Sequence, residues 1–317
     1  MDREQEQMQF LRLFGIFKGS YKIIISWRKI FTQITLTLIL PLTFIFLAHL
    51  GISNSLFQET KRYHDLSDTF SPKWITFLPF EIAYITIFLI LYLLSTAAVV
   101  YTIASVYTGR ELTFKEVMSV VPKVWKKLMI TFLCMIAISF VYIFLGALAM
   151  FISLFSVPYP LGVILAFAVL IIYMIGLMYM TVCWQLASVV SVLESLCGFK
   201  AMAKSKDLIK GNRIVAISVS FLLSLPFFFI KLLFELLVVH GSSLQVWKRV
   251  SLGVLCSILL LYVFLFDLVI HTVLYLVCKS YHHENIDKED LSNHLESYLG
   301  EYEPLSGEDV KLEQYQV

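Results

Sequence analysis

The chain has 317 residues, of which 59% are apolar and 15% are charged, and its mean hydropathy is +0.80. Because a soluble domain usually carries about a quarter charged residues, this composition excludes an ordinary water-soluble protein. The net charge of +2 is the sum of a basic body and an acidic tail, so it gives no support for a nucleic-acid partner.

Six apolar blocks predict six membrane-spanning helices, at residues 31–50, 79–106, 128–155, 161–190, 214–240 and 251–278. Each block reaches the length of about 20 residues that a helix needs to cross roughly 30 Å of hydrocarbon. We therefore expect an all-α integral membrane protein, a six-span helical bundle. Its membrane domain covers residues 30–279, between an N-terminal amphipathic segment, 1–29, and an acidic tail, 280–317.

The distribution of Lys and Arg predicts the orientation of the bundle. The termini and the connections on their side of the membrane hold 19 of the 25 basic residues, the other side holds five, and Lys231 lies within a span. Because positively charged loops are retained in the cytoplasm, both termini are predicted to be cytoplasmic. The membrane is expected to be the endoplasmic reticulum or the plasma membrane.

The basic segments before spans one, three and five carry apolar residues at helical spacing, which is typical of interfacial amphipathic helices. Thr113 and Glu116 form a capping-box pattern at the start of the second segment. Phe17, Phe114 and Phe199 begin similar stretches at intervals of 97 and 85 residues. This spacing favours three repeated hairpins, although any basic segment before a span has a similar composition. The candidate contacts for anionic lipid in the cytoplasmic leaflet are Lys123, Lys126, Lys127, Lys200, Lys204 and Lys206.

Asp267 and His271 are the best candidates for an intramembrane site, since ionisable groups within a span are costly and often functional. They are four residues apart on one helix face, with Gln185 as a candidate partner from span four. Such a pair can bind a cation or relay protons. The alternative is a polar pair that only holds span six in the bundle. Nearer the outer face, interfacial anchors and ion pairs are expected among Lys231, Glu235, His49, Glu81 and His240.

The sequence contains no nucleotide-binding glycine loop, nucleophile elbow or zinc-type His-Glu-x-x-His motif. We therefore expect no enzyme activity, no cofactor and no metal. His282 and His283 beside Glu284 are interpreted as polar surface.

The acidic tail holds ten Asp or Glu against two Lys. Leu291, Leu295 and Leu299 lie on one face of a possible short helix that can dock on the basic helices or on a cytoplasmic protein partner. Further along, Tyr302 and Leu305 form the Tyr-x-x-apolar pattern of a sorting signal.

Four segments carry a family resemblance, namely LSTAAVVYTIASVYTGRELTF, SVVPKVWKKLMITFL, WQLASVVSVLES and the stretch from VCKSYHHENID to YLGEYEPL. They closely resemble a family of uncharacterised plant multi-pass membrane proteins over nearly the whole chain. More distantly, the pattern of span, basic segment and span resembles the membrane region of prokaryotic glycerophosphodiester phosphodiesterases. That region is not the catalytic part, so the resemblance implies fold and membrane location and transfers no catalytic residue.

Three hypotheses follow for the function. The favoured one is a non-catalytic scaffold, trafficking or lipid-interacting accessory protein. The alternatives are a small-solute or ion transporter that uses Asp267 and His271, and an intramembrane lipid enzyme.

Overall fold

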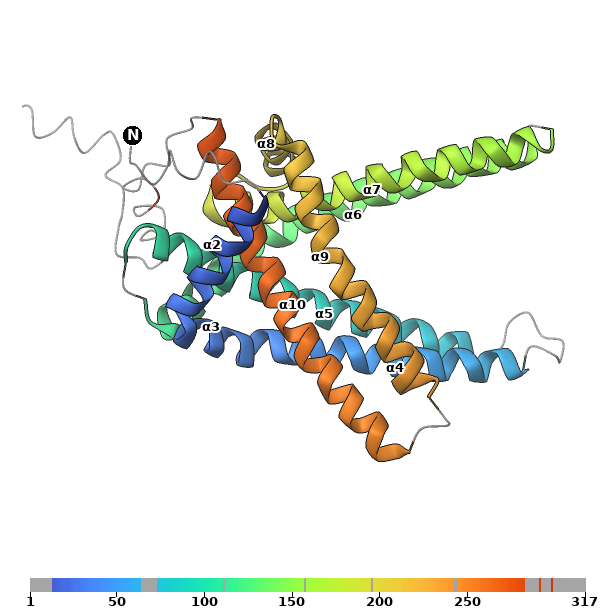
Figure 1. Ribbon diagram of the computed structural model, residues 1–317, viewed down its shortest axis with the longest axis horizontal. Helices are drawn as coiled ribbons and strands as arrows, with labels where there is room; N and C mark the ends of the chain where they lie inside the picture. The colour runs from blue at the N-terminus through green and yellow to red at the C-terminus, as the bar shows by residue number, and fades with distance from the viewer. Residues whose placement is uncertain are drawn as a thin grey trace, which may run out of the picture.

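The computed structural model describes residues 13–63, 73–110, 112–156, 158–194, 196–241 and 245–282, together with Leu291 and Tyr298. Every regular element in these ranges is helical (Figure 1). Within them, six helices are long and apolar enough to cross a membrane: Arg28–Asn54, Leu78–Tyr107, Phe114–Phe155, Leu161–Leu193, Arg213–Val239 and Val246–Tyr281. The predicted all-α architecture with six spans is therefore confirmed, and the chain is a multi-pass integral membrane protein.

The first span is built from α3 (Arg28–Ile34), the π-helical turn η1 (Thr35–Ile39) and α4 (Leu40–Tyr63), and α2 (Leu13–Ser26) precedes it. The next three long helices are α5 (Lys73–Tyr107), α6 (Phe114–Phe155) and α7 (Leu161–Leu193). The short α8 (Phe199–Ile209) leads to α9 (Arg213–Phe234) with the π-helical turn η2 (Glu235–Val239), and finally to α10 (Val246–Tyr281). Gly211 follows α8 with φ of 97°, a conformation that favours glycine at the end of a helix.

The long helices form three hairpins, α4–α5, α6–α7 and α9–α10, which diverge from one end of the molecule (Figure 1). That end carries α2, the first turns of α6, α8 and the last turns of α10, and it is called the basic end below. The opposite turns are called the hairpin tips. Three hairpins are thus present, each entered from the basic end, as the spacing of the basic segments predicted.

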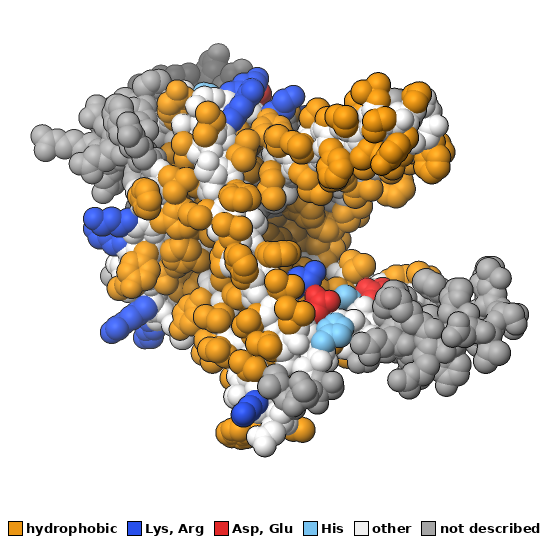
Figure 2. All heavy atoms as spheres, turned by 45° about the vertical axis from the view of Figure 1, so that its right-hand side comes forward, with side chains coloured by type: hydrophobic (Ala, Val, Ile, Leu, Met, Phe, Trp, Pro, Cys, Tyr) orange, Lys and Arg blue, Asp and Glu red, His pale blue; other side chains and the backbone are white. Residues whose placement is uncertain are grey.

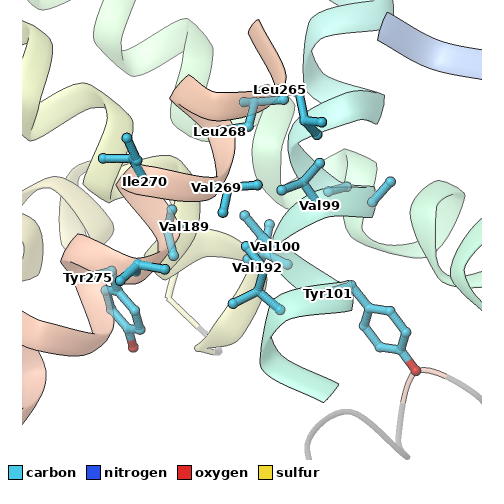
Figure 3. Packing of buried hydrophobic residues seen from close by; sticks show 14 of the residues in the cluster. Val99, Val100, Tyr101, Val189, Val192, Leu265, Leu268, Val269, Ile270 and Tyr275 are labelled. Atoms are coloured by element: carbon cyan, nitrogen blue, oxygen red, sulfur yellow. The ribbon is translucent and has the colours of Figure 1, made fainter. Parts of the chain in front are cut away.

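The core lies where α5, α7 and α10 meet in the half of the bundle next to the basic end (Figure 3). Val100, Val189 and Val269 pack there with almost no exposed surface. Four small residues at helical spacing on α5 are all buried: Ser95, Ala98, Thr102 and Ser105. Because small side chains let helix backbones approach closely, this face explains why α5 lies at the centre of the bundle.

The α6–α7 hairpin leaves this core as a separate arm (Figure 1). Only 17% and 11% of the most apolar windows of its two helices are buried, against 50% in the first span. Its own contacts are reciprocal: Tyr142 packs against Gly176, and Tyr173 packs against Gly146. The two tyrosine rings stack with centroids 5.1 Å apart, and the Tyr142 hydroxyl donates to the Tyr173 carbonyl at 3.0 Å. The arm is therefore held together by glycine–tyrosine packing.

The segment before the third span differs from the separate interfacial helix that was expected. The capping box of Thr113 and Glu116 is present, but the helix that it starts continues without a break through all 42 residues of α6. No glycine interrupts the register between the basic segment and the span, and Pro122 does not end the helix. The apolar face of this segment, including Val117 and Val124, is buried against the protein. Its lysines are consequently left at the surface of the basic end.

Candidate functional site

The three residues of the predicted intramembrane site lie together, with Gln185 on α7 and the other two on α10. Gln185 Nε2 donates to both carboxylate oxygens of Asp267, at 3.4 Å each. His271 Nδ1 lies 3.3 Å from Asp267 Oδ1. Asp267 is 12 residues from Lys279 at the end of the span, which corresponds to roughly 18 Å of helix. An acidic side chain is thus held within a membrane span, well away from the end of that span.

The hydrogen bonds of His271 define its tautomer. Nδ1 lies 2.8 Å from the backbone oxygen of Asp267, and a carbonyl only accepts, so Nδ1 carries a proton. Nε2 lies 3.1 Å from Oγ of Ser220 on α9, and in the neutral ring it accepts from that hydroxyl. Both ring nitrogens are therefore satisfied, and the imidazole joins α10 to α9. Sequence reasoning missed Ser220, because nothing local distinguishes it from other serines in a span.

A small cavity adjoins this trio between α5, α7 and α10. Its polar lining includes Tyr92, Thr96 and Ser188 as well as Gln185 and Asp267. The volume open to the centre of a water molecule is about 10 Å³, which is room for about one water. Gln185 Oε1 is buried there, and none of the described residues donates a hydrogen bond to it. The site therefore combines a carboxylate and an unused amide oxygen, acceptors that suit one water, a proton or a small cation.

The candidate lipid-binding lysines all lie at the basic end. Lys123, Lys126, Lys200 and Lys206 are exposed, and Lys127 and Lys204 are half-buried. Figure 2 shows Lys and Arg side chains gathered at the side from which the hairpins diverge, next to wide hydrophobic flanks.

On α2, exposed apolar side chains share the surface with lysines: Phe14, Tyr21 and Ile25 lie beside Lys18 and Lys22. Such a surface suits the boundary between headgroups and acyl chains.

One residue of the acidic tail is seated on two of these lysines. Tyr298 is 9% exposed, and its backbone oxygen accepts a hydrogen bond from Lys123 Nζ. Its hydroxyl accepts from Lys127 Nζ at 3.0 Å and donates to the Val192 carbonyl at 3.4 Å. The Lys127 ammonium also lies 5.2 Å from the centre of the ring. Tyr298 therefore connects the tail to α6 and α7, whereas Leu295 and Leu299 of the predicted apolar face lie outside the described residues.

Comparison with known families adds one finding. Residues 1–315 match the model of a family described as a domain of unknown function, DUF8558. The chain belongs to this family. No curated protein and no solved structure matches the chain.

A second polar contact of the DUF8558 protein lies where α7 ends, at Glu194. Its carboxylate accepts hydrogen bonds from the Tyr275 hydroxyl at 2.7 Å and from Lys279 Nζ at 3.0 Å. Burial alone would raise the pKa of Glu194, but the Tyr275 hydrogen bond and the Lys279 charge outweigh it and hold this pKa below its usual value. The contact joins residues 81 and 85 positions apart, so sequence reasoning did not find it.

The polar residues toward the hairpin tips form interfacial pairs. His49 Nε2 lies 2.9 Å from a Glu81 carboxylate oxygen, and the His49 ring stacks on Tyr84 with centroids 3.6 Å apart. Asn54 lies at hydrogen-bonding distance, 3.5 Å, from Glu235. His240, which was expected to join these side chains, instead contacts the Glu235 backbone oxygen at 3.0 Å. These groups hold α4, α5 and η2 together, and the His49–Glu81 contact is one of the expected ion pairs.

The predicted sorting signal, Tyr302 and Leu305, lies outside the described residues, as does His283. Among the residues that are described, no group of three or more His, Cys, Asp or Glu could hold a metal ion.

Proposed function

We propose that this DUF8558 protein is a non-catalytic membrane protein that binds anionic lipid at its basic end and serves as a scaffold, trafficking or lipid-interacting accessory protein. The observation that carries the proposal is the charge at that end. Over the described ranges, 15 Lys or Arg lie there, against the three acidic residues Glu116, Glu194 and Asp207. Each lysine or arginine near an anionic leaflet contributes about 1 kcal/mol to lipid attraction.

The same excess of positive charge supports the proposed orientation, with the basic end and both termini in the cytoplasm of the endoplasmic reticulum or plasma membrane. The acidic tail then faces the cytoplasm, where it is available to a protein partner, and the Tyr302–Leu305 pattern is available to sorting machinery. These assignments follow from the side of the membrane on which the charge is placed.

The test compares lipid preference in proteoliposomes. The protein is reconstituted with trace spin-labelled phosphatidylserine or phosphatidylcholine, and the motionally restricted fraction of each lipid is measured. Replacing the three exposed lysines Lys126, Lys200 and Lys206 with Gln removes about 3 kcal/mol of attraction, so the preference for phosphatidylserine falls by up to about a hundredfold. Lys248→Gln is the matched control, because Lys248 is exposed near a hairpin tip. Equal preference in the triple variant and the wild type contradicts the proposal.

A second candidate function is ion or proton transport through the Asp267 site. It is supported by the cavity beside Asp267 and by the unused Gln185 oxygen. Asp267→Asn keeps the shape of the side chain and removes its charge, so this candidate requires loss of proton or sodium flux in proteoliposomes. Flux equal to the wild type excludes a role for Asp267 in transport. An intramembrane lipid enzyme ranks lower, because room for about one water is too small for a lipid headgroup.

A further inference from the structure

An apolar groove lies between α2 and the α9–α10 hairpin. Leu223 and Leu265 form its floor and are almost completely buried. Phe17 packs toward Phe266 at one wall, with ring centroids 6.2 Å apart. The exposed rim is formed by Tyr21, Ile25, Leu222 and Tyr262. The groove encloses about 450 Å³, which falls within the range of small-molecule binding sites, about 300–1,000 Å³.

The surroundings of the groove identify its occupant. Both helices of the α9–α10 hairpin are membrane spans, so lipid acyl chains surround them and have access to the open side of the groove. Lys18 and Lys22 on α2 are exposed, and each lies three residues before a rim residue, Tyr21 or Ile25. Residues three apart are neighbours on a helix surface. An apolar slot is therefore bordered by two cations at the basic end.

We propose that this groove binds one acyl chain of an anionic phospholipid and that Lys18 and Lys22 bind its headgroup phosphate. This site rests on the proposed function, but it goes beyond general attraction to a charged leaflet. The lysines on α6 and α8 attract many lipids to a surface, whereas the groove retains a single lipid through its chain. Because lipid tails are as apolar as the groove, the chain is retained by its van der Waals fit in the groove. The contribution from the lysines depends on the charge of the headgroup.

The experiment measures lipid retained by the purified full-length protein. The protein is delipidated in detergent and titrated with phosphatidylserine or phosphatidylcholine of identical chains, and bound lipids are counted by native mass spectrometry. Wild type is expected to retain one phosphatidylserine. Leu222→Trp fills the groove and is expected to lower the occupancy about tenfold. The matched control is Leu233→Trp on the same helix, since Leu222 and Leu233 are 43% and 40% exposed and only Leu222 lines the groove.

The two parts of the site are separated by a second variant. The double substitution Lys18→Gln and Lys22→Gln is expected to reduce the preference for phosphatidylserine over phosphatidylcholine by more than tenfold, because both lysines attract the anionic headgroup. Retention of the acyl chain is expected to persist. Crosslinking of the unaltered protein with phosphatidylserine that carries a diazirine in its chain does not depend on the folding of any variant. Its adducts are expected in the peptides of α2, α9 and α10.

Retention of phosphatidylserine by Leu222→Trp at the wild-type level overturns the groove site, and so do adducts confined to other helices. The outcome is distinguishable from failure of the proposed function. If the substitutions at Lys126, Lys200 and Lys206 leave the lipid preference in proteoliposomes unchanged but Leu222→Trp still loses its lipid, the groove site stands alone.

Discussion

Removing the ring of Tyr298 is expected to release the tail from the basic end and to free Lys123 and Lys127 from their contacts with Tyr298. Tyr298→Ala removes the hydrogen bond between the Tyr298 hydroxyl and Lys127, at 3.0 Å, and the ring beneath that ammonium. A hydrogen bond to a charged group is worth about 1.5–3 kcal/mol, and the cation–π contact adds about 0.5–1 kcal/mol. Loss of both is sufficient to detach a short tail segment. Hydrogen–deuterium exchange of the tail peptides measures this release.

The functional consequence is larger lipid attraction. Lys123 and Lys127, freed from Tyr298, add about 2 kcal/mol toward an anionic leaflet, which corresponds to about a thirtyfold higher preference for phosphatidylserine. The spin-labelled lipid assay in proteoliposomes measures this change. Tyr298→Phe keeps the ring and loses both hydroxyl hydrogen bonds, so it is expected to be intermediate. If exchange shows a released tail while the preference for phosphatidylserine stays at the wild-type level, then Tyr298 does not compete with lipid and the reasoning fails.

Three further predictions concern stability in detergent. Gly146→Ala places a methyl group 2.5 Å from the Tyr173 ring, so we expect about 1–3 kcal/mol of destabilisation and a lower thermal midpoint. Thr131→Val removes the hydroxyl that accepts from the buried Gly198 amide at 2.8 Å; an unsatisfied buried amide costs about 1–3 kcal/mol, seen as an earlier loss of helical circular dichroism on heating. Because the pKa of Glu194 is lowered in the folded protein, its contribution to stability is complete above the unfolded value, about 4.3, and is lost as pH falls through the folded pKa. Glu194→Gln is therefore expected to reduce the acid sensitivity of the thermal midpoint.

The glycine substitution has a control elsewhere in the chain. Gly19→Ala meets no atom within 4 Å of the added methyl group and lies within α2, so it is expected to stabilise the helix by about 0.5–1 kcal/mol. A lower midpoint in that variant would show that glycine substitutions act through something other than close packing. For Glu194, an unchanged pH dependence in the Gln variant would assign the acid sensitivity to other carboxylates.

The spans and the intramembrane trio were predictable because their signals are local or periodic. A long apolar block predicts a helix that spans the membrane. Asp267 and His271 are four residues apart, so they are expected on the same face of a helix. Gln185 was a candidate partner from span four, and its contact with Asp267 joins residues 82 positions apart. By contrast, the partners that complete the site come from other helices. Ser220 is 51 residues from His271, and its contact depends on the rotation of α9 against α10, which a single sequence does not encode in any local pattern.

The basic segments show the same division. Their charge was evident from composition, but the burial of Val117 and Val124 against the protein and the continuity of α6 depend on how α6 meets α5 and α7. Lys123 and Lys127 donate hydrogen bonds to Tyr298, which lies 175 and 171 residues further along the chain. Two of the lysines that the sequence suggested as lipid contacts are therefore bound to another part of the same chain.

The divergence of the three hairpins gives the molecule a different footprint in each half of the bilayer. Near the basic end the helices share a packed core, so the protein occupies one continuous area of that leaflet (Figure 3). Toward the tips, the α6–α7 arm stands apart from the other hairpins across an open hollow (Figure 2). Lipids of that leaflet have to enter between the hairpins and pack against helix surfaces on several sides. The protein therefore presents a longer lipid-contacting perimeter to the leaflet at the hairpin tips than to the leaflet at the basic end. More lipids contact the protein in the leaflet at the tips.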